Sequence, residues 1–187
     1  MAIDKEAREQ RKTEFLDAAE RLFSEKGILN TSVSTIVKEL NVAKGLFYYY
    51  FKSKDEVIDA ISKRYSTSFE ENLMEEIKED GTYDERLEGF IDAMIDSFRK
   101  VKSKIGNNRE DTDMAILSSR ILKDAKTFTS KKLCALLEEG NRIGKLHVSN
   151  PTYLSDMIVS AISDLSNKAN TDFKEVKKII MDAIKRS

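Results

Sequence analysis

The sequence predicts an all-α protein, with an N-terminal three-helix helix-turn-helix domain over residues 1–53 and a C-terminal helical bundle over residues 54–187. Its 187 residues include one proline and seven glycines, the residues that most often interrupt helices. Apolar residues recur every three or four positions along most of the chain, as on one face of a helix. Hydrophobic residues make up 40% and charged residues 35%, which allows both a core and a solvated surface.

The first three helices are short amphipathic segments separated by turn residues. We expect the first helix over residues 4–26, because its apolar positions fall on one face and Gly27 suits a left-handed cap. The second is expected over residues 32–40, capped by Thr31 or Ser32. Asn41 tolerates the left-handed geometry of a sharp turn. The third, over residues 43–50, is then the second half of a helix-turn-helix.

Large aromatic side chains are unevenly placed on the third helix. Phe47 and Tyr50 are three residues apart and can face inward together, which leaves the other bulky side chains pointing outward. Those residues are Lys44, Leu46, Tyr48 and Tyr49. Exposed rings beside a lysine suit contact with DNA, where a hydroxyl donates to phosphate and a ring packs on sugar or a thymine methyl. The alternative is that both tyrosines pack against the first helix. Gly45 lets the backbone approach DNA or the second helix closely.

A capping pattern, Ser53 to Glu56, opens the fourth helix. With Lys52 and Lys54, the positive end of that helix is expected to bind phosphate. Residues 1–54 hold ten lysines and arginines against eight acidic residues, a balance of +2, while the whole chain has a net charge of −1. DNA binding therefore requires a local basic surface. Three N-terminal basic residues suit either contact with the DNA backbone or a solvated helix face: Arg8, Arg11 and Lys12.

Together, these residues resemble the tetracycline-repressor (TetR) family of bacterial transcription regulators. The resemblance spans about 45 residues. The residues that match the family's pattern are Ala18, Ala19, Leu22, Phe23, Gly27, Thr31, Ile36, Val42, Lys44, Gly45, Tyr48, Tyr50, Phe51, Lys54 and Glu56. It implies that DNA is contacted by Lys44, Tyr48, Tyr49 and Lys54, with Thr31 and Ser32 assisting at phosphates. Gly45 and Leu46 are expected at the same DNA interface. Ala43 departs from the family's capping serine, and Asn41 from its frequent glycine. Leu46 replaces a small or polar residue, so the operator sequence stays open.

The remaining chain continues as amphipathic helices. We expect helices over residues 54–79 and 84–103, a loop over 105–110, and two shorter helices over 112–122 and 129–143. Asn150 and Pro151 suit the start of the next helix. Asp172 and Glu175 provide an acidic first turn for the last.

The last two helices are expected to pair with those of a second copy across a two-fold axis, the dimer that the resemblance also implies. The interface would use Leu154, Ile158, Ile162, Leu165, Val176, Ile180 and Ile184. The alternative is that both apolar faces only cover the monomer core.

A small-molecule effector pocket is expected among aromatic and methionine residues: Tyr65, Phe69, Phe90, Met94, Phe98, Met114, Phe128 and Met157. Core packing is the competing role for each of them.

The expected protein is a homodimeric, cytoplasmic, sequence-specific repressor that an effector of unknown identity releases from an inverted-repeat operator. It is expected to need no cofactor. Cys134 and His147 are the only residues of their types, so a Cys/His zinc site and an internal disulfide are excluded. No apolar run approaches a membrane span. The alternatives are a sequence-indifferent architectural DNA binder and a small helical enzyme, and no nucleophile–base pair or phosphate loop supports the enzyme.

Overall fold

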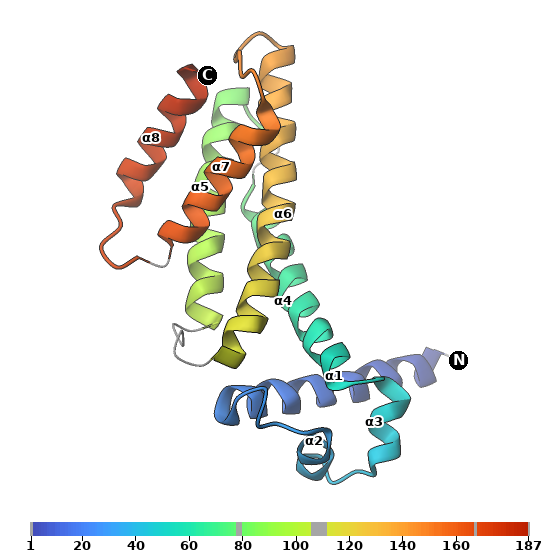
Figure 1. Ribbon diagram of the computed structural model, residues 1–187. Coiled ribbons are helices and arrows are strands. Elements are labelled where there is room, and N and C mark those ends of the chain that lie inside the picture. The colour runs from blue at the N-terminus through green and yellow to red at the C-terminus, as the bar shows by residue number, and fades with distance from the viewer. Residues whose placement is uncertain (1, 78–79, 106–111, 167, 187) are drawn as a thin grey trace. The chain divides into compact units, whose positions relative to one another are not determined.

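The computed structural model describes residues 2–77, 80–105, 112–166 and 168–186. Within these ranges every regular element is an α-helix (Figure 1), as the composition predicts. The helices are α1 (Ala2–Lys26), α2 (Val33–Glu39), α3 (Lys44–Tyr50), α4 (Lys54–Glu76), α5 (Tyr83–Ile105), α6 (Thr112–Arg142), α7 (Pro151–Leu165) and α8 (Phe173–Arg186).

The chain folds as two compact units. The first contains residues up to Tyr65 together with the described part of residues 108–121, and the second contains the rest. This grouping differs from the expected boundary after residue 53, because the N-terminal half of α4 and the first ten residues of α6 belong to the first unit. Helix α4 is therefore shared, with residues 54–65 in the first unit and residues 66–76 in the second.

The first unit begins with the three predicted helices. Gly27 ends α1 with a φ of 81°, and Asn41 turns the chain between α2 and α3 with a φ of 51°, so both left-handed positions are confirmed. The N–H of Val42 donates to the carbonyl of Val37 across this turn at 3.0 Å. Helices α1 and α2 are also joined at their surface by an ion pair between Arg21 and Glu39.

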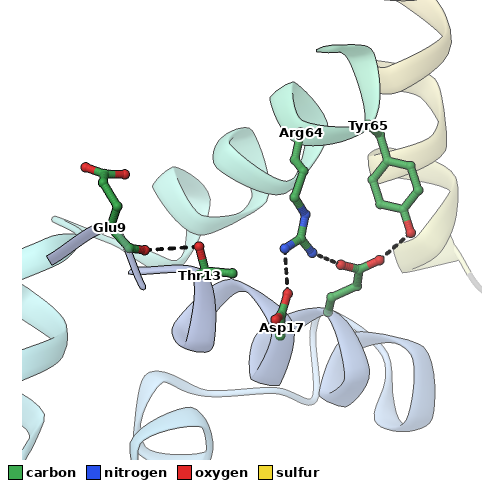
Figure 2. Close-up of polar contacts among 6 residues, drawn as sticks. Glu9, Thr13, Asp17, Arg64 and Tyr65 are labelled. Carbon is green, nitrogen blue, oxygen red and sulfur yellow. Dashed lines mark hydrogen bonds and ion pairs between the residues drawn. The ribbon is translucent and has the colours of Figure 1, made fainter. Parts of the chain in front are cut away.

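An arginine and a tyrosine join α4 to α1 within the first unit. Figure 2 shows the Arg64 guanidinium bonded to Asp17, and its other terminal nitrogen donates to Glu20. The Tyr65 hydroxyl donates to the second oxygen of Glu20. Burial, reinforced by that hydrogen bond, raises the pKa of Tyr65 to about 12, so the hydroxyl keeps its proton and remains a donor. Tyr65 is thus a structural contact between α4 and α1 within the first unit.

The second unit is a bundle in which α5 contacts both α7 and α8. The three helices run alongside one another in Figure 1. Thr82 and Glu85 form a capping box before α5, with each side chain bonded to the other's backbone N–H. The side chain of Asn150 caps α7 through the N–H of Tyr153, and Pro151 occupies the first turn, as predicted.

The expected break within residues 112–143 is wrong. Helix α6 continues from Thr112 to Arg142 without interruption, because residues 123–128 contain neither glycine nor proline and the buried Ala125 and Thr129 keep the helical spacing. From residue 106 onward, the expected loop over 105–110 lies outside the described residues, and Ile105 is the last residue of α5.

Candidate nucleic-acid interface and ligand groove

The orientation of α3 is determined by an aromatic cluster on its inner side. Phe15, Phe47 and Phe51 are fully buried, with ring centroids 5.6–6.2 Å apart. The half-buried Tyr50 adds a fourth ring, 5.8 Å from that of Phe15. Such ring pairs contribute about 0.5–1.5 kcal/mol each beyond the area they bury. Because Phe47, Phe51 and the half-buried Tyr50 occupy the inner side, Tyr48 and Tyr49 are left largely exposed.

The outer side of α3 carries two exposed tyrosines and two cations, which together we call the cationic–aromatic surface: Arg8, Lys44, Tyr48 and Tyr49. Tyr48 is 51% exposed and Tyr49 61% exposed. The Lys44 ammonium lies 6.0 Å from the Tyr48 ring centroid, and the Arg8 guanidinium lies 5.2 Å from that of Tyr49. Arg8 comes from α1, so helix spacing alone does not place it beside α3. The surface presents hydroxyls, rings and positive charges together, which are the groups that bind a nucleic-acid backbone.

The first turn of α3 is open on its outer side. A Cβ atom added to Gly45 would have no other atom within 4 Å, so packing within the chain does not require a glycine there. Leu46 is half-buried and Lys44 is exposed. Ala43 occupies the cap position without a side-chain hydrogen bond, which is the consequence of its departure from the family's serine.

Thr31 is part of the core, so the prediction that it assists at a DNA phosphate is wrong. It has no exposed surface, and its hydroxyl can donate to the carbonyls of Gly27, at 2.8 Å, or Leu22, at 3.2 Å. A buried hydroxyl needs such a partner. Ser32 is exposed and caps α2 by accepting from the N–H of Thr35 at 3.1 Å.

Lys54 also has partners inside the protein. Its ammonium donates to the carbonyls of Ile28, at 2.5 Å, and Thr31, at 3.0 Å, in the turn between α1 and α2. The expected capping pattern is present, with the N–H of Glu56 donating to the Ser53 hydroxyl. Lys54 therefore positions that turn, whereas the neighbouring Lys52 is exposed.

The second unit has a groove of about 410 Å³ between the end of α4, α5 and α6. Its apolar lining is Met74, Ile77, Phe90, Ala135 and Leu136, and its charged lining is Arg86, Lys132 and Glu139. Arg86 and Glu139 form a two-fold hydrogen-bonded pair, which holds the pKa of Glu139 below its ordinary value. A larger hollow of about 740 Å³ along α5 is lined by six carboxylates. In the part of the chain that the structure describes, no cluster of histidine, cysteine or acidic residues could hold a metal ion.

The residues expected to line the effector pocket lie in different environments. Phe69, Met94 and Phe98 are buried in the core of the second unit, and Phe90 both packs there and borders the groove. Phe128 is half-buried beneath Lys132. The Met114 side chain lies outside the described residues, and Met157 is largely exposed. The groove also uses Met74, Ile77 and Leu136, which sequence periodicity marks only as part of apolar helix faces.

The isoleucines expected at a dimer interface are used inside the second unit. Ile158, Ile162, Ile180 and Ile184 are buried in a single chain, so the alternative of monomer core packing describes them. The half-buried residues of the expected interface are Leu154, Leu165 and Val176. The large apolar side chains that these two helices do expose are Tyr153 (70% exposed), Met157 (69%) and Ile179 (60%).

Comparison with known proteins matches the N-terminal region to one family. Residues 15–61 match the model of bacterial regulatory proteins of the tetR family. A fatty acid metabolism regulator protein of Bacillus subtilis is 36% identical over 74 residues, which are 40% of this chain and 38% of that protein. Over the first three curated relatives, the match spans 38–55% of the relative's length.

Solved structures resemble nearly the whole chain. A TetR/AcrR family regulator from Thermobifida fusca has a TM-score of 0.62 at 21% identity and covers 94% of this chain and 96% of its own. The regulator FadR from Bacillus subtilis, solved in complex with stearoyl-CoA, has a TM-score of 0.60 at 22% identity. The match covers 93% of this chain and 97% of the FadR chain. At these identities the likeness shows that the fold is shared.

Proposed function

Because the chain belongs to the TetR family of bacterial regulatory proteins, we propose that it is a DNA-binding transcriptional regulator that acts as a homodimeric repressor. The observation that carries this proposal is the cationic–aromatic surface on α3. Tyr48 and Tyr49 each contact a neighbouring ring of α3 and remain more than half exposed beside Lys44 and Arg8. Their exposed rings and hydroxyls suit DNA phosphates and base edges. The matched relatives are named as regulators, which favours this function over the architectural and enzymatic alternatives.

In the proposed complex, the α3 helices of two protomers enter successive major grooves about 34 Å apart, so the operator is an inverted repeat. A small-molecule effector stabilises a conformation that binds the operator poorly and so releases it. FadR from Bacillus subtilis has been solved with stearoyl-CoA, which supports a ligand-responsive second unit here. Among the described residues no helix is long and apolar enough to span a membrane. We place the protein in the cytoplasm, because a bacterial regulator must reach the chromosome.

Substitutions on α3 test DNA recognition. Lys44→Ala and Tyr48→Phe are each expected to weaken operator binding by about 1–3 kcal/mol, because each removes a contact to phosphate or a base edge. The operator would be obtained by selecting bound duplexes from a random pool, and affinities measured by gel-shift titration at fixed salt. Lys131→Ala, an exposed change on α6, serves as the control. Full affinity in both α3 variants would reject this interface, and equal affinity for unrelated duplexes would favour an architectural binder.

The dimer is proposed to use the exposed face of α7 and α8. Tyr153 and Met157 lie one turn apart on α7, next to the small exposed residues Ser160 and Ala161. A closely approaching partner helix can pack on such a face. Ile179 is the large apolar side chain that α8 exposes, and we propose that it belongs to the same interface.

Met157→Glu tests this interface. Burying the carboxylate against a second copy is unfavourable. The variant is therefore expected to raise the dimer dissociation constant by at least about tenfold, which corresponds to roughly 1.4 kcal/mol. Sedimentation velocity over a concentration series measures the shift. Lys174→Glu, an exposed change on α8, is the control. A dimer unaffected by Met157→Glu would place the interface elsewhere.

A further inference from the structure

The groove between α4, α5 and α6 combines an apolar wall with an uncompensated positive charge. One face of α6 supplies Lys132, Ala135, Leu136 and Glu139, which follow the i, i+3, i+4, i+7 spacing. Opposite it lie Arg86 and Phe90, one turn apart on α5, together with Met74 in the last turn of α4 and Ile77 just beyond that helix. The volume of about 410 Å³ falls within the range of small-molecule sites.

The charges of the groove do not cancel. Arg86 and Glu139 neutralise each other through their paired hydrogen bonds. Among the described residues no ion pair involves Lys132, whose ammonium lies 5.6 Å from the Phe128 ring centroid. The lining therefore carries one net positive charge beside five apolar residues. A ligand that matches it has one negative charge and an apolar body, because a cation would be repelled by Lys132 and a neutral molecule would gain nothing from its charge.

We propose that this groove binds an amphipathic monoanion, an alkyl carboxylate, with its carboxylate at Lys132 and its tail along Met74, Phe90 and Leu136. The Arg86–Glu139 pair forms the polar edge of the site. As the effector site, the groove rests on the proposed function, whereas ligand binding itself is independent of DNA.

Three ligands with ten carbon atoms each and different head groups test the charge requirement: decanoate, decanol and decylammonium. Calorimetry on the full-length protein without DNA, at ligand concentrations below micelle formation, measures each affinity. Decanoate is expected to bind at least about tenfold more tightly than decanol, and decylammonium more weakly than both. Equal affinity for the three would overturn the proposal, as would tighter binding of decanoyl-CoA than of decanoate.

Two substitutions identify the site. Lys132→Met keeps the length of the side chain and removes its charge, so decanoate affinity should fall to that of decanol, while Lys132→Arg should retain the preference. Lys131→Met changes the neighbouring exposed lysine, which does not line the groove, and should have no effect. Ala135 is exposed on the groove side, so Ala135→Trp should block all three ligands without affecting the core. Unchanged binding in Lys132→Met or Ala135→Trp would refute this location.

Because these measurements contain no DNA, their failure is distinguishable from failure of the repressor assignment. Decanoate binding with no selected duplex would remove the regulatory role and leave the ligand site. Operator binding with no charge preference among the three ligands would remove the proposed ligand site and leave the regulatory role.

Discussion

Gly140→Ala is expected to lower the free energy of unfolding by about 1–3 kcal/mol, although alanine is the better helix former. A Cβ atom at this position on α6 would fall closest to the Tyr83 hydroxyl oxygen and within 2.7 Å of the Leu146 methyl carbon Cδ1. Tyr83 cannot easily move away, because it is buried and its hydroxyl donates to the Leu136 carbonyl at 3.0 Å. The added methyl therefore has to displace packed atoms.

A second glycine provides the matched control. A Cβ atom at Gly89 on α5 would have no atom within 4 Å outside its own helix, so Gly89→Ala should stabilise the protein by about 0.5–1 kcal/mol. The midpoint of urea denaturation should fall for Gly140→Ala and rise for Gly89→Ala. Tyr83→Phe loses one hydrogen bond but should cost less in the Gly140→Ala background than in the wild type. Equal stabilisation by both alanines would mean that Gly140 is not closely packed.

Lys54→Met is expected to destabilise the first unit by about 2–3 kcal/mol. A lysine in the first turn of a helix is opposed by the helix dipole, so its presence there needs a compensating interaction. The two carbonyls of Ile28 and Thr31 provide it, and hydrogen bonds to a charged group contribute about 1.5–3 kcal/mol each. Without the ammonium, both carbonyls would lose this partner and the turn before α2 would loosen.

The control for this prediction is the neighbouring lysine. Lys52→Met changes an exposed side chain and should leave the free energy of unfolding within about 0.5 kcal/mol of the wild-type value. Thermal unfolding and operator titration should be measured on both variants. If Lys54 acts mainly at a DNA phosphate, its substitution would weaken operator binding and leave unfolding unchanged. That result would contradict the structural role argued here.

The local sequence was sufficient for the elements of the N-terminal unit. The spacing of Phe15, Phe47 and Phe51 determines which side of α3 is buried, and the outward direction of Tyr48 and Tyr49 follows from it. Gly27 and Asn41 mark left-handed positions by their residue type alone, because few other residues adopt positive φ at low cost. These predictions depend on neighbours within a few residues, which periodicity and turn preferences describe well.

Side-chain partners distant in sequence could not be predicted in the same way. Thr31 and Lys54 look like surface residues in the sequence, yet one is buried and the other bonds to a turn 23 residues earlier in the chain. Arg8 lies over Tyr49 although 41 positions separate them (49 minus 8). Only the packing of α1 against α3 and α4 brings such groups together.

Helix α7 shows the same division. Its apolar residues are spread around much of its circumference, so Ile158 and Ile162 were as plausible at an interface as Tyr153 and Met157. The sequence by itself determined that α7 is a helix with a capped start at Asn150, because capping and propensity act locally. Contact with α5 selected which apolar side is buried, and that choice left Tyr153 and Met157 exposed to solvent. Burial of one side against another helix is a property of the assembled bundle, and no short stretch of sequence contains it.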